Sequence, residues 1–229
     1  MLTTTVIIPA LNEAGNIGKL VHEVRVIAPV EVIVVDNNST DSTAEEARAA
    51  GAKVVIASQR GYGYACATGV ATARDADVLV FMDGDYSFSP TDLPLLLSPI
   101  LEGRADMVLG SRELSIKTSH AMPPHQRFGN WLASRLMNAL YGLSITDLGP
   151  YRAIRSQLLN KLDMQEMTYG WPTEMIVKSA RRGARIAEVP VSYQSRRFGH
   201  SKVSGTVRGT ILATWFILGV TFRYAWRIR

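Results

Sequence analysis

The stretch VLVFMDGDYSFSP, residues 78–90, runs an apolar segment directly into two aspartates, Asp83 and Asp85, separated by one glycine. A continuous apolar run of this length is typical of a strand that is buried on both faces of a parallel sheet. Two carboxylates crowded at the end of such a strand raise each other's pKa unless a cation or hydrogen-bond donors compensate. The stretch therefore predicts a buried strand that delivers two acids to a site with a positively charged partner.

On either side of this stretch, short β-branched runs alternate with helical patterns. We expect strands at residues 4–9, 31–36, 52–57, 77–83 and 106–112, and helices at 16–27, 43–50 and 64–74. Strands and helices that alternate at this spacing are typical of a mostly parallel sheet with crossover helices. The sequence therefore predicts an α/β fold.

The second half of the chain is less regular. A polar segment with prolines, Ser115–Gln126, follows the last clear strand and is interpreted as a mobile loop near a site. After it we expect a helix at 128–141, a loop at 146–150, a helix at 172–182 and a strand at 185–189.

Composition sets the class of protein. The chain has 229 residues, of which 47% are hydrophobic and 20% charged, as in a folded domain with a sizeable core. The net charge of +5 favours acidic partners such as phosphates, nucleic acid or an anionic membrane surface, without separating them. Cys66 is the lone cysteine, and the N-terminus runs directly into a strand pattern without signal-peptide features, so we expect a cytoplasmic protein.

Polar residues follow the first four predicted strands. Asn12 and Glu13 come after the first, residues 36–41 after the second, 58–63 after the third, and the DGD triplet after the fourth. Open parallel sheets bind ligands beyond the carboxyl ends of their strands, so these residues predict a site at one edge of the sheet. A second acid pair, Asp75 and Asp77, precedes its strand, and we expect it at the opposite edge as solvated turn residues.

The Asp83 and Asp85 pair has two interpretations. Carboxylate oxygens suit a hard cation, Mg²⁺ or Mn²⁺, which proteins hold with one or two carboxylates together with substrate phosphates. The alternative is a turn in which an aspartate accepts a hydrogen bond from the backbone and caps the next helix.

Four spaced motifs resemble those of family 2 glycosyltransferases with the GT-A fold, from about Val6 to Ser204. They are VIIPALNEAGNI, VIVVDNNSTDST, RGYGYA, and MDGDYSFSP followed by LGSR. Later elements, DLGPYRAIR, YGWPTEM and RRFGHSK at 196–202, look like the dolichol-phosphate mannose synthase branch. That branch transfers a sugar from a nucleotide donor to a polyprenyl phosphate. The resemblance thus implies a GT-A domain at 1–204 with a Rossmann-like central sheet.

The resemblance also implies roles for individual residues. Asp83 and Asp85 would hold the metal, Asp36 would contact the nucleobase, and a basic group would gather the phosphates. The residues implied for nucleotide-sugar binding are Pro9, Ala10, Asn12, Glu13, Asp36, Asn38, Arg60, Gly61, Gly63, Asp83 and Gly84, and those for catalysis are Asp85, Arg112, Arg127, Glu174, Arg196 and Lys202. Ser87 stands where the branch usually has a glutamine as a further metal contact, which leaves the third protein ligand open.

The acceptor decides whether a general base is needed. A phosphate oxygen is already ionised at neutral pH and can attack the donor sugar without one. A soluble hydroxyl acceptor would need a carboxylate base, for which Glu174 and Asp147 are the candidates. A third hypothesis is a nonenzymatic module that binds anionic ligands. We expect a UDP- or GDP-linked sugar as the donor and no nucleic-acid partner.

The C-terminal segment 205–229 is expected to be an apolar helix. Its uncharged run Gly209–Phe222 is too short to span a bilayer. Arginine and aromatic residues flank the run, as in helices that lie among lipid headgroups; they are Arg208, Arg223, Tyr224, Trp226, Arg227 and Arg229. The alternatives are an oligomer contact or a cover over the sheet.

Overall fold

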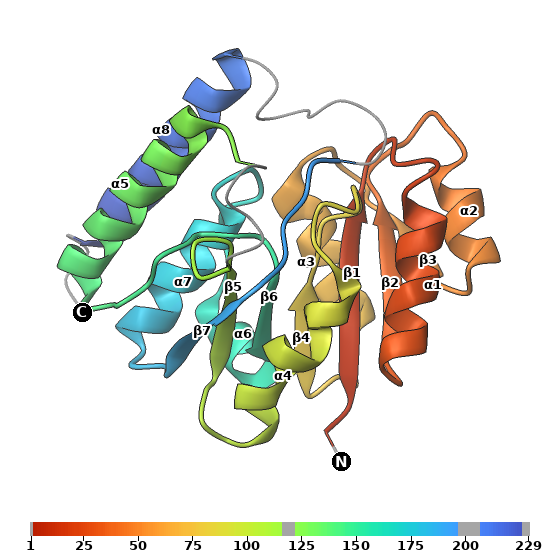
Figure 1. Cartoon of the computed structure of the whole chain (residues 1–229), viewed down its shortest axis with the longest axis horizontal. Helices are drawn as coiled ribbons and strands as arrows, with labels where there is room; N and C mark the ends of the chain where they lie inside the picture. The colour runs from red at the N-terminus through yellow and green to blue at the C-terminus, as the bar shows by residue number, and fades with distance from the viewer. Residues whose placement is uncertain (1, 116–121, 197–206, 226–229) are drawn as a thin grey trace.

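The computed structural model describes residues 2–115, 122–196 and 207–225, with side chains from Trp215 onward in the last range. In these ranges one sheet has seven strands in the order β3-β2-β1-β4-β6-β5-β7 (Figure 1). The strands are β1 (Thr4–Ala10), β2 (Glu31–Asp36), β3 (Lys53–Ile56), β4 (Val78–Phe81), β5 (Met107–Ser111), β6 (Arg152–Arg155) and β7 (Ile186–Pro190). The helices are α1 (Ile17–Ile27), α2 (Thr43–Ala49), α3 (Tyr62–Thr72), η1 (Pro90–Asp92), α4 (Leu93–Leu101), α5 (Pro124–Tyr141), α6 (Ser156–Leu162), α7 (Trp171–Arg181) and α8 (Val207–Ala225).

The direction of the strands brings their carboxyl ends to one edge. β1 pairs in parallel with β2 and β4, and β2 pairs in parallel with β3. β6 runs antiparallel to both β4 and β5, so β5 points the same way as β4, and β7 is parallel to β5. The predicted α/β class with a mostly parallel sheet is confirmed, and the loops after β1 to β4 meet at one edge.

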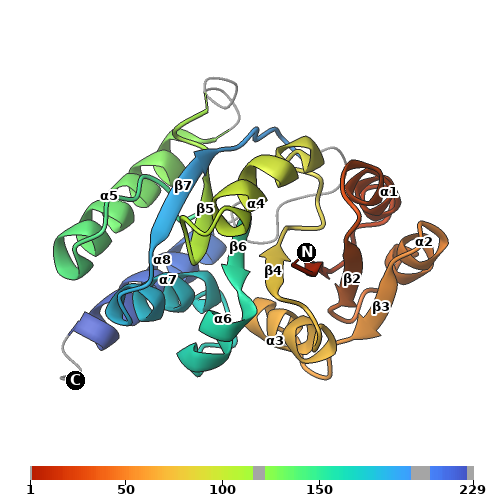
Figure 2. The same ribbon diagram turned by 90° about the horizontal axis from the view of Figure 1, so that it is seen from below.

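Helices cover both faces of the sheet. α1, α2 and α4 pack on one face, and α3, α6 and α7 on the other (Figure 2). Successive residues of a strand point to opposite faces, so Ile8 joins the first core and Ile7 the second. Val34 and Val35 of β2 divide in the same way. Burial on both sides explains why the strands are continuously apolar.

Several boundaries and elements differ from the predictions. α3 begins at Tyr62, two residues earlier than expected, and α5 begins at Pro124, inside the segment expected to be a loop. Residues 116–121 of that segment lie outside the described ranges. α4, α6 and β6 were not predicted. β6 has only four residues, Arg-Ala-Ile-Arg, whose charged ends hide a strand that lies between β4 and β5.

The C-terminal part of α8 packs against α5 and α7. Val220 and Tyr224 are buried in the second core, and the Tyr141 hydroxyl donates a hydrogen bond to the Thr221 carbonyl oxygen at 2.5 Å. This half of the helix therefore covers other helices rather than the sheet. None of the helices in the described ranges combines the length and hydrophobicity that crossing a bilayer requires.

Candidate active site

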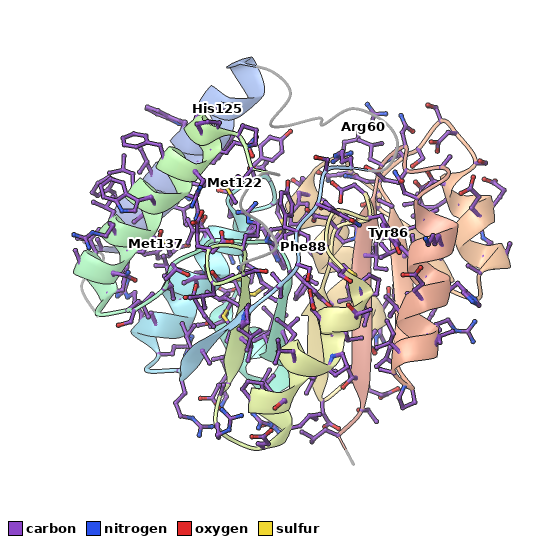
Figure 3. The ribbon with its side chains drawn as sticks, viewed as in Figure 1. Arg60, Tyr86, Phe88, Met122, His125 and Met137 are labelled. Atoms are coloured by element: carbon purple, nitrogen blue, oxygen red, sulfur yellow. The ribbon has the colours of Figure 1, made fainter. Side chains whose placement is uncertain are left out.

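A cleft of about 450 Å³ opens at the edge where the parallel strands end. Its walls come from the loops after β1, β2, β3 and β4, from the segment before α7 and from the segment after β7. The lining residues are Pro9, Ala10, Leu11, Glu13, Asn37, Arg60, Gly61, Tyr62, Asp83, Gly84, Asp85, Thr168, Tyr169 and Arg196. Figure 3 labels Arg60 at this edge. The structure thus brings most of the predicted nucleotide-sugar residues together.

The DGD triplet forms the floor of the cleft. A Cβ atom on Gly84 would lie 3.3 Å from the Ala10 Cβ and the Pro9 carbonyl oxygen, so glycine lets the triplet lie against the end of β1. Burial and the neighbouring Asp85 carboxylate raise the pKa of Asp83 to about 7. Asp85 Oδ1 accepts the Ser87 N–H at 3.0 Å, so the expected turn forms, but the next helices begin after Ser89 and Asp92, and Asp85 does not cap them.

Arg196 supplies the positive charge at these acids. Its Nη2 lies 2.9 Å from Asp85 Oδ2, and its Nη1 lies 3.1 Å from Glu13 Oε1. The guanidinium also lowers the pKa of Asp83 against the effects of burial and of Asp85. Arg196 comes from the segment after β7, and Glu13 lies 183 positions earlier in the loop after β1. Their contact joins these two segments at the cleft.

Two predicted nucleotide contacts tie the rim loops together instead of lining the cleft. Asn12 Oδ1 accepts the Thr40 N–H at 2.8 Å, and Asn38 Nδ2 donates to the Ala57 carbonyl oxygen at 3.2 Å. Both asparagines have a positive φ, 51° and 65°, which asparagine adopts more readily than most residues. Asp36 is buried at the end of β2, where its Oδ1 accepts the Ser39 N–H at 3.0 Å. It lies outside the set of residues that line the cleft.

The two glycines of the RGYG loop have different surroundings. Gly61 lines the cleft, has a φ of 148°, and donates its N–H to Asn37 Oδ1 at 3.3 Å. Gly63 is buried, and a Cβ atom there would lie 2.4 Å from the Met167 carbonyl carbon. Its small size lets α3 pack on the segment before α7, and Gly63 does not line the cleft, so its role in donor approach stays a prediction.

The predicted basic group is divided among several places. Arg112 forks onto the buried Asp147, with Nε and Nη2 each 2.8 Å from a carboxylate oxygen. Although burial opposes it, this pair raises the pKa of Arg112 above its ordinary value. Arg127 is exposed on α5 and pairs with Glu113 at 3.2 Å, away from the cleft. Lys202 lies outside the described residues.

Glu174 is a buried anchor rather than a residue of the cleft. Its Oε2 accepts the N–H groups of Gln165 and Glu166 at 2.9 and 2.7 Å. Its Oε1 accepts the Tyr224 hydroxyl at 2.6 Å and lies 2.8 Å from Lys178 Nζ. Although burial acts in the opposite direction, these partners lower the pKa of Glu174. The expectation that Glu174 serves as a base does not fit this position, because it holds α7, α8 and residues 165–166 together.

Some lining residues were not predicted. The Tyr62 hydroxyl hydrogen-bonds to Asp83 and lowers its pKa, and Thr168 and Tyr169 line the opposite wall. Behind them Arg152 is fully buried and donates hydrogen bonds to the carbonyl oxygens of Pro172 at 2.6 Å and Leu148 at 3.1 Å. The motifs RGYGYA, DLGPYRAIR and YGWPTEM contain or adjoin these positions, but nothing local in the sequence shows which side chains face the cleft.

The residues present fit a divalent cation that a ligand completes. In the described ranges no group of three or more Asp, Glu, His or Cys side chains is arranged to hold a metal. Two carboxylates at a strand end are, however, the protein share of sites that bind Mg²⁺ together with substrate phosphates. Burial and the Asp85 carboxylate raise the pKa of Asp83 although Arg196 lowers it, so a further cation at this pair would favour the ionised form.

Comparison with known proteins agrees with this geometry. The sequence model described as "Glycosyl transferase family 2" matches residues 5–163. An uncharacterized glycosyltransferase of Mycobacterium tuberculosis (strain ATCC 25618 / H37Rv) is 37% identical over 91% of this chain and 93% of its own length. An undecaprenyl-phosphate mannosyltransferase of Micrococcus luteus is 33% identical over 95% of this chain and 94% of its own. A dolichyl-phosphate hexose transferase of Haloferax volcanii is 34% identical over 90% and 89%.

A solved structure shares the fold. Glucosyl-3-phosphoglycerate synthase from Mycobacterium tuberculosis, in complex with Mn²⁺, UDP and phosphoglyceric acid, superposes with a TM-score of 0.76. It is 22% identical in sequence, and the match covers 100% of this chain and 80% of that one. The architecture is therefore the GT-A fold. With a family match across most of its length and relatives that align almost end to end, the chain belongs to glycosyl transferase family 2.

Proposed function

We propose that the enzyme transfers a hexose from a nucleotide sugar, of the GDP-mannose or UDP-glucose type, to a polyprenyl phosphate, with inversion at the anomeric carbon. An acceptor phosphate oxygen forms the new bond to that carbon. The bond from the carbon to the diphosphate oxygen breaks, and the nucleoside diphosphate leaves. Relatives named for transfer to undecaprenyl, dolichyl and polyprenol phosphates support this acceptor class.

The cleft residues would divide the work on the donor. Asp83 and Asp85 would hold Mg²⁺ or Mn²⁺, which when bound offsets negative charge on the departing diphosphate. Arg60 and the main chain at Gly61 line the same cleft and are positioned to contact the donor. Asp36, buried at the end of β2, is proposed to accept hydrogen bonds from the base once that loop opens to the ligand.

One observation carries the choice of acceptor: both candidate bases already have structural partners. Asp147 is fully buried in its fork with Arg112, and Glu174 accepts four hydrogen bonds or ionic contacts away from the cleft. A hydroxyl acceptor would need one of them released, whereas a phosphate oxygen needs no base at neutral pH. The geometry therefore favours a phosphate acceptor over a soluble hydroxyl acceptor. Membership of an enzyme family sets aside the nonenzymatic hypothesis.

The test is a matrix of donors and acceptors. Purified protein with Mn²⁺ or Mg²⁺ receives GDP-mannose or UDP-glucose, and either undecaprenyl phosphate, dolichyl phosphate or 3-phosphoglycerate. We expect a glycosyl phospholipid, detected by mass spectrometry, whose anomeric configuration is opposite to that of the donor. Product on 3-phosphoglycerate alone would contradict the lipid acceptor, and donor turnover lost in Glu174→Gln at an unchanged melting temperature would support a base mechanism.

A lipid acceptor implies contact with a membrane, and the exposed side of α5 favours that contact. Phe128 and Trp131 are 63% and 54% exposed, and their rings stack with centroids 5.8 Å apart. Leu132 extends this apolar surface, and Arg127 and Arg135 flank it. Aromatic residues beside arginines suit an anionic lipid surface. The end of α8 is partly buried against α5 and α7, so not all of Gly209–Phe222 is available for the membrane contact predicted from the sequence. We therefore propose α5 as part of that contact.

Vesicle flotation tests this face without substrate or turnover. Wild-type protein should float with vesicles that contain phosphatidylglycerol, and the double variant Phe128→Ser with Trp131→Ser should lose about tenfold or more of this binding. Val26→Ser is the matched control, because Val26 is 72% exposed on α1. Equal flotation of the wild type and the double variant would exclude α5 as the contact.

A further inference from the structure

We infer that Arg196 is a positioning residue that acts as a placeholder cation. It holds Asp85 and Glu13 in the free enzyme and makes metal binding depend on a nucleoside diphosphate. The inference rests on the proposed donor site and concerns what keeps that site in order before substrate arrives.

The contacts place Arg196 and a metal ion in competition for the same oxygen. Arg196 Nη2 is 2.9 Å from Asp85 Oδ2, while Asp85 Oδ1 accepts the Ser87 N–H. Both carboxylate oxygens of Asp85 are therefore occupied by donors from the chain itself. A cation bound at Asp85 Oδ2 would lie close to the guanidinium, and the repulsion between the two positive groups favours a state in which only one of them holds that oxygen.

The same guanidinium also restrains Glu13. Arg196 Nη1 is 3.1 Å from Glu13 Oε1, and the Glu13 side chain is 7% exposed. Glu13 is fixed further by its N–H, which donates to Thr43 Oγ1 at 2.8 Å. Removing Arg196 without a replacement would leave two largely buried acids, Glu13 and Asp85, without this cation, in addition to Asp83.

A diphosphate is negatively charged, like the Asp85 carboxylate, and can replace that carboxylate as the partner of Arg196. An arginine fork binds phosphate oxygens as well as carboxylates, so the guanidinium can transfer from Asp85 to the ligand without losing its ionic contacts. Arg196 lines the cleft with Arg60 and Gly61, so this transfer needs only a local shift. By thermodynamic reciprocity, nucleotide then tightens metal binding by the same factor as metal tightens nucleotide binding.

The measurement is Mn²⁺ affinity in the absence of turnover, followed by electron paramagnetic resonance of free Mn²⁺. Each protein is titrated alone, with GDP and with UDP. We expect wild type to bind Mn²⁺ weakly alone and at least tenfold more tightly with one nucleotide. In Arg196→Gln the affinity for Mn²⁺ alone should rise by about tenfold, as close charge pairs couple by 1.4 kcal/mol or more.

Two further variants separate the placeholder from a general effect of charge. Arg60→Gln removes one positive charge from the same cleft, where Arg60 Nη2 donates to the Asn38 carbonyl oxygen at 3.3 Å. It should raise Mn²⁺ affinity much less. Arg196→Lys keeps the charge but cannot fork between two acids, so it should lie between wild type and Arg196→Gln.

The sign of the change decides the outcome. A residue that merely supports the fold would lower Mn²⁺ affinity when removed, so a fall or no change in Arg196→Gln, or an equal rise in Arg60→Gln, would overturn the inference. If Arg196→Gln does not fold, Arg196→Lys gives the same comparison. Failure of wild type to bind Mn²⁺ with either nucleotide would instead overturn the proposed donor site.

Discussion

Two acid pairs with the same spacing lie at opposite ends of β4, and their surroundings could hardly differ more. Before the strand, Asp77 accepts the Thr3 N–H at 2.8 Å and the Thr3 hydroxyl at 3.0 Å, and these hydrogen bonds lower its pKa. After the strand, burial and Asp85 raise the pKa of Asp83 to about 7. Hydrogen bonds thus favour the ionised form of Asp77, whereas burial and the Asp85 carboxylate disfavour the ionised form of Asp83.

A buried carboxyl group with a raised pKa marks the site better than motif spacing or cleft size does. A larger groove, of about 900 Å³, lies at the amino ends of the strands and includes Asp75. The cleft with Asp83 and Asp85 has about half that volume. Perturbed titration in a cleft is the observation that points to function, because a buried charge is costly unless a ligand offsets it.

The test with the largest expected effect replaces an aspartate by asparagine in each pair, so that one carboxylate oxygen becomes an amide nitrogen. Asp85→Asn removes the charge that would face the metal and the diphosphate, so we expect kcat to fall by roughly a hundredfold or more. Asp77→Asn keeps an oxygen that can accept the Thr3 hydrogen bonds, and its rate should stay within about twofold of wild type. Both rates are measured as sugar transfer to the lipid acceptor at saturating donor.

Similar effects of the two substitutions on rate would show that the two acid pairs do not differ in function. Circular dichroism and melting temperatures of both variants serve as the control, because a misfolded Asp85→Asn protein would mimic a catalytic loss. A folded Asp85→Asn enzyme with a wild-type rate would remove this carboxylate from the proposed mechanism.

Glu174 extends the comparison to an acid that is both buried and satisfied. Glu174→Gln leaves Lys178 without its ionic partner and turns one acceptor oxygen into a donor, which should lower stability by about 1–3 kcal/mol. For a chain of this size that corresponds to a fall in melting temperature of roughly 3–10 °C. We expect kcat of the folded protein to stay within a few fold of wild type, because Glu174 does not line the cleft.

The opposite pattern would restore Glu174 as a base. A loss of turnover of roughly a hundredfold with an unchanged melting temperature would show that its hydrogen bonds to residues 165–166 and Tyr224 yield during the reaction. Tyr224→Phe is the matched control, because it removes one hydrogen bond to Glu174 and leaves the carboxylate intact.

Much of the fold could be predicted because its signals are local. Apolar runs such as Val78–Phe81 and the polar residues that follow each strand are legible in a few positions, and they place Asp83 and Asp85 at the correct edge. β6 was not predicted from the sequence because its burial depends on its position between two other strands. Its Arg152 is charged in the sequence and yet fully buried, since the carbonyl oxygens of the nearby Leu148 and of the more distant Pro172 accept its hydrogen bonds.

Contacts between distant segments explain why several site residues have surroundings that the sequence did not suggest. Gly63 looks like part of a ligand loop until Met167 packs against it, and Glu174 looks like a free acid until Tyr224 reaches it from the last helix. Arg196 was expected near phosphates, but its fork between Glu13 and Asp85 depends on three segments meeting. No periodicity or spacing within one segment carries this information.

The pH dependence of stability should differ in sign between the two acid pairs. Asp83 should make the protein less stable as pH rises. A carboxyl whose folded pKa is raised binds more protons folded than unfolded, so it destabilises the protein as pH rises from about 4 through 7. Asp83→Asn should therefore melt a few degrees above wild type at pH 8 without metal, and the difference should vanish near pH 4. A variant that melts below wild type at pH 8 would contradict the raised pKa.

Asp77 should show the reverse trend with a smaller amplitude. Its folded pKa is lowered by the Thr3 hydrogen bonds, so its charge stabilises the protein above the unfolded pKa and the benefit is lost as pH falls through the folded pKa. Asp77→Asn should melt about 1 °C below wild type at pH 7 and match it in acid, the small size reflecting an exposed carboxylate. Differential scanning calorimetry of both variants across pH measures the two trends together. If Asp77→Asn instead raised the melting temperature at pH 7, Asp→Asn substitutions would stabilise the protein at both ends of β4. The two acid pairs would then not differ in how their charge affects stability.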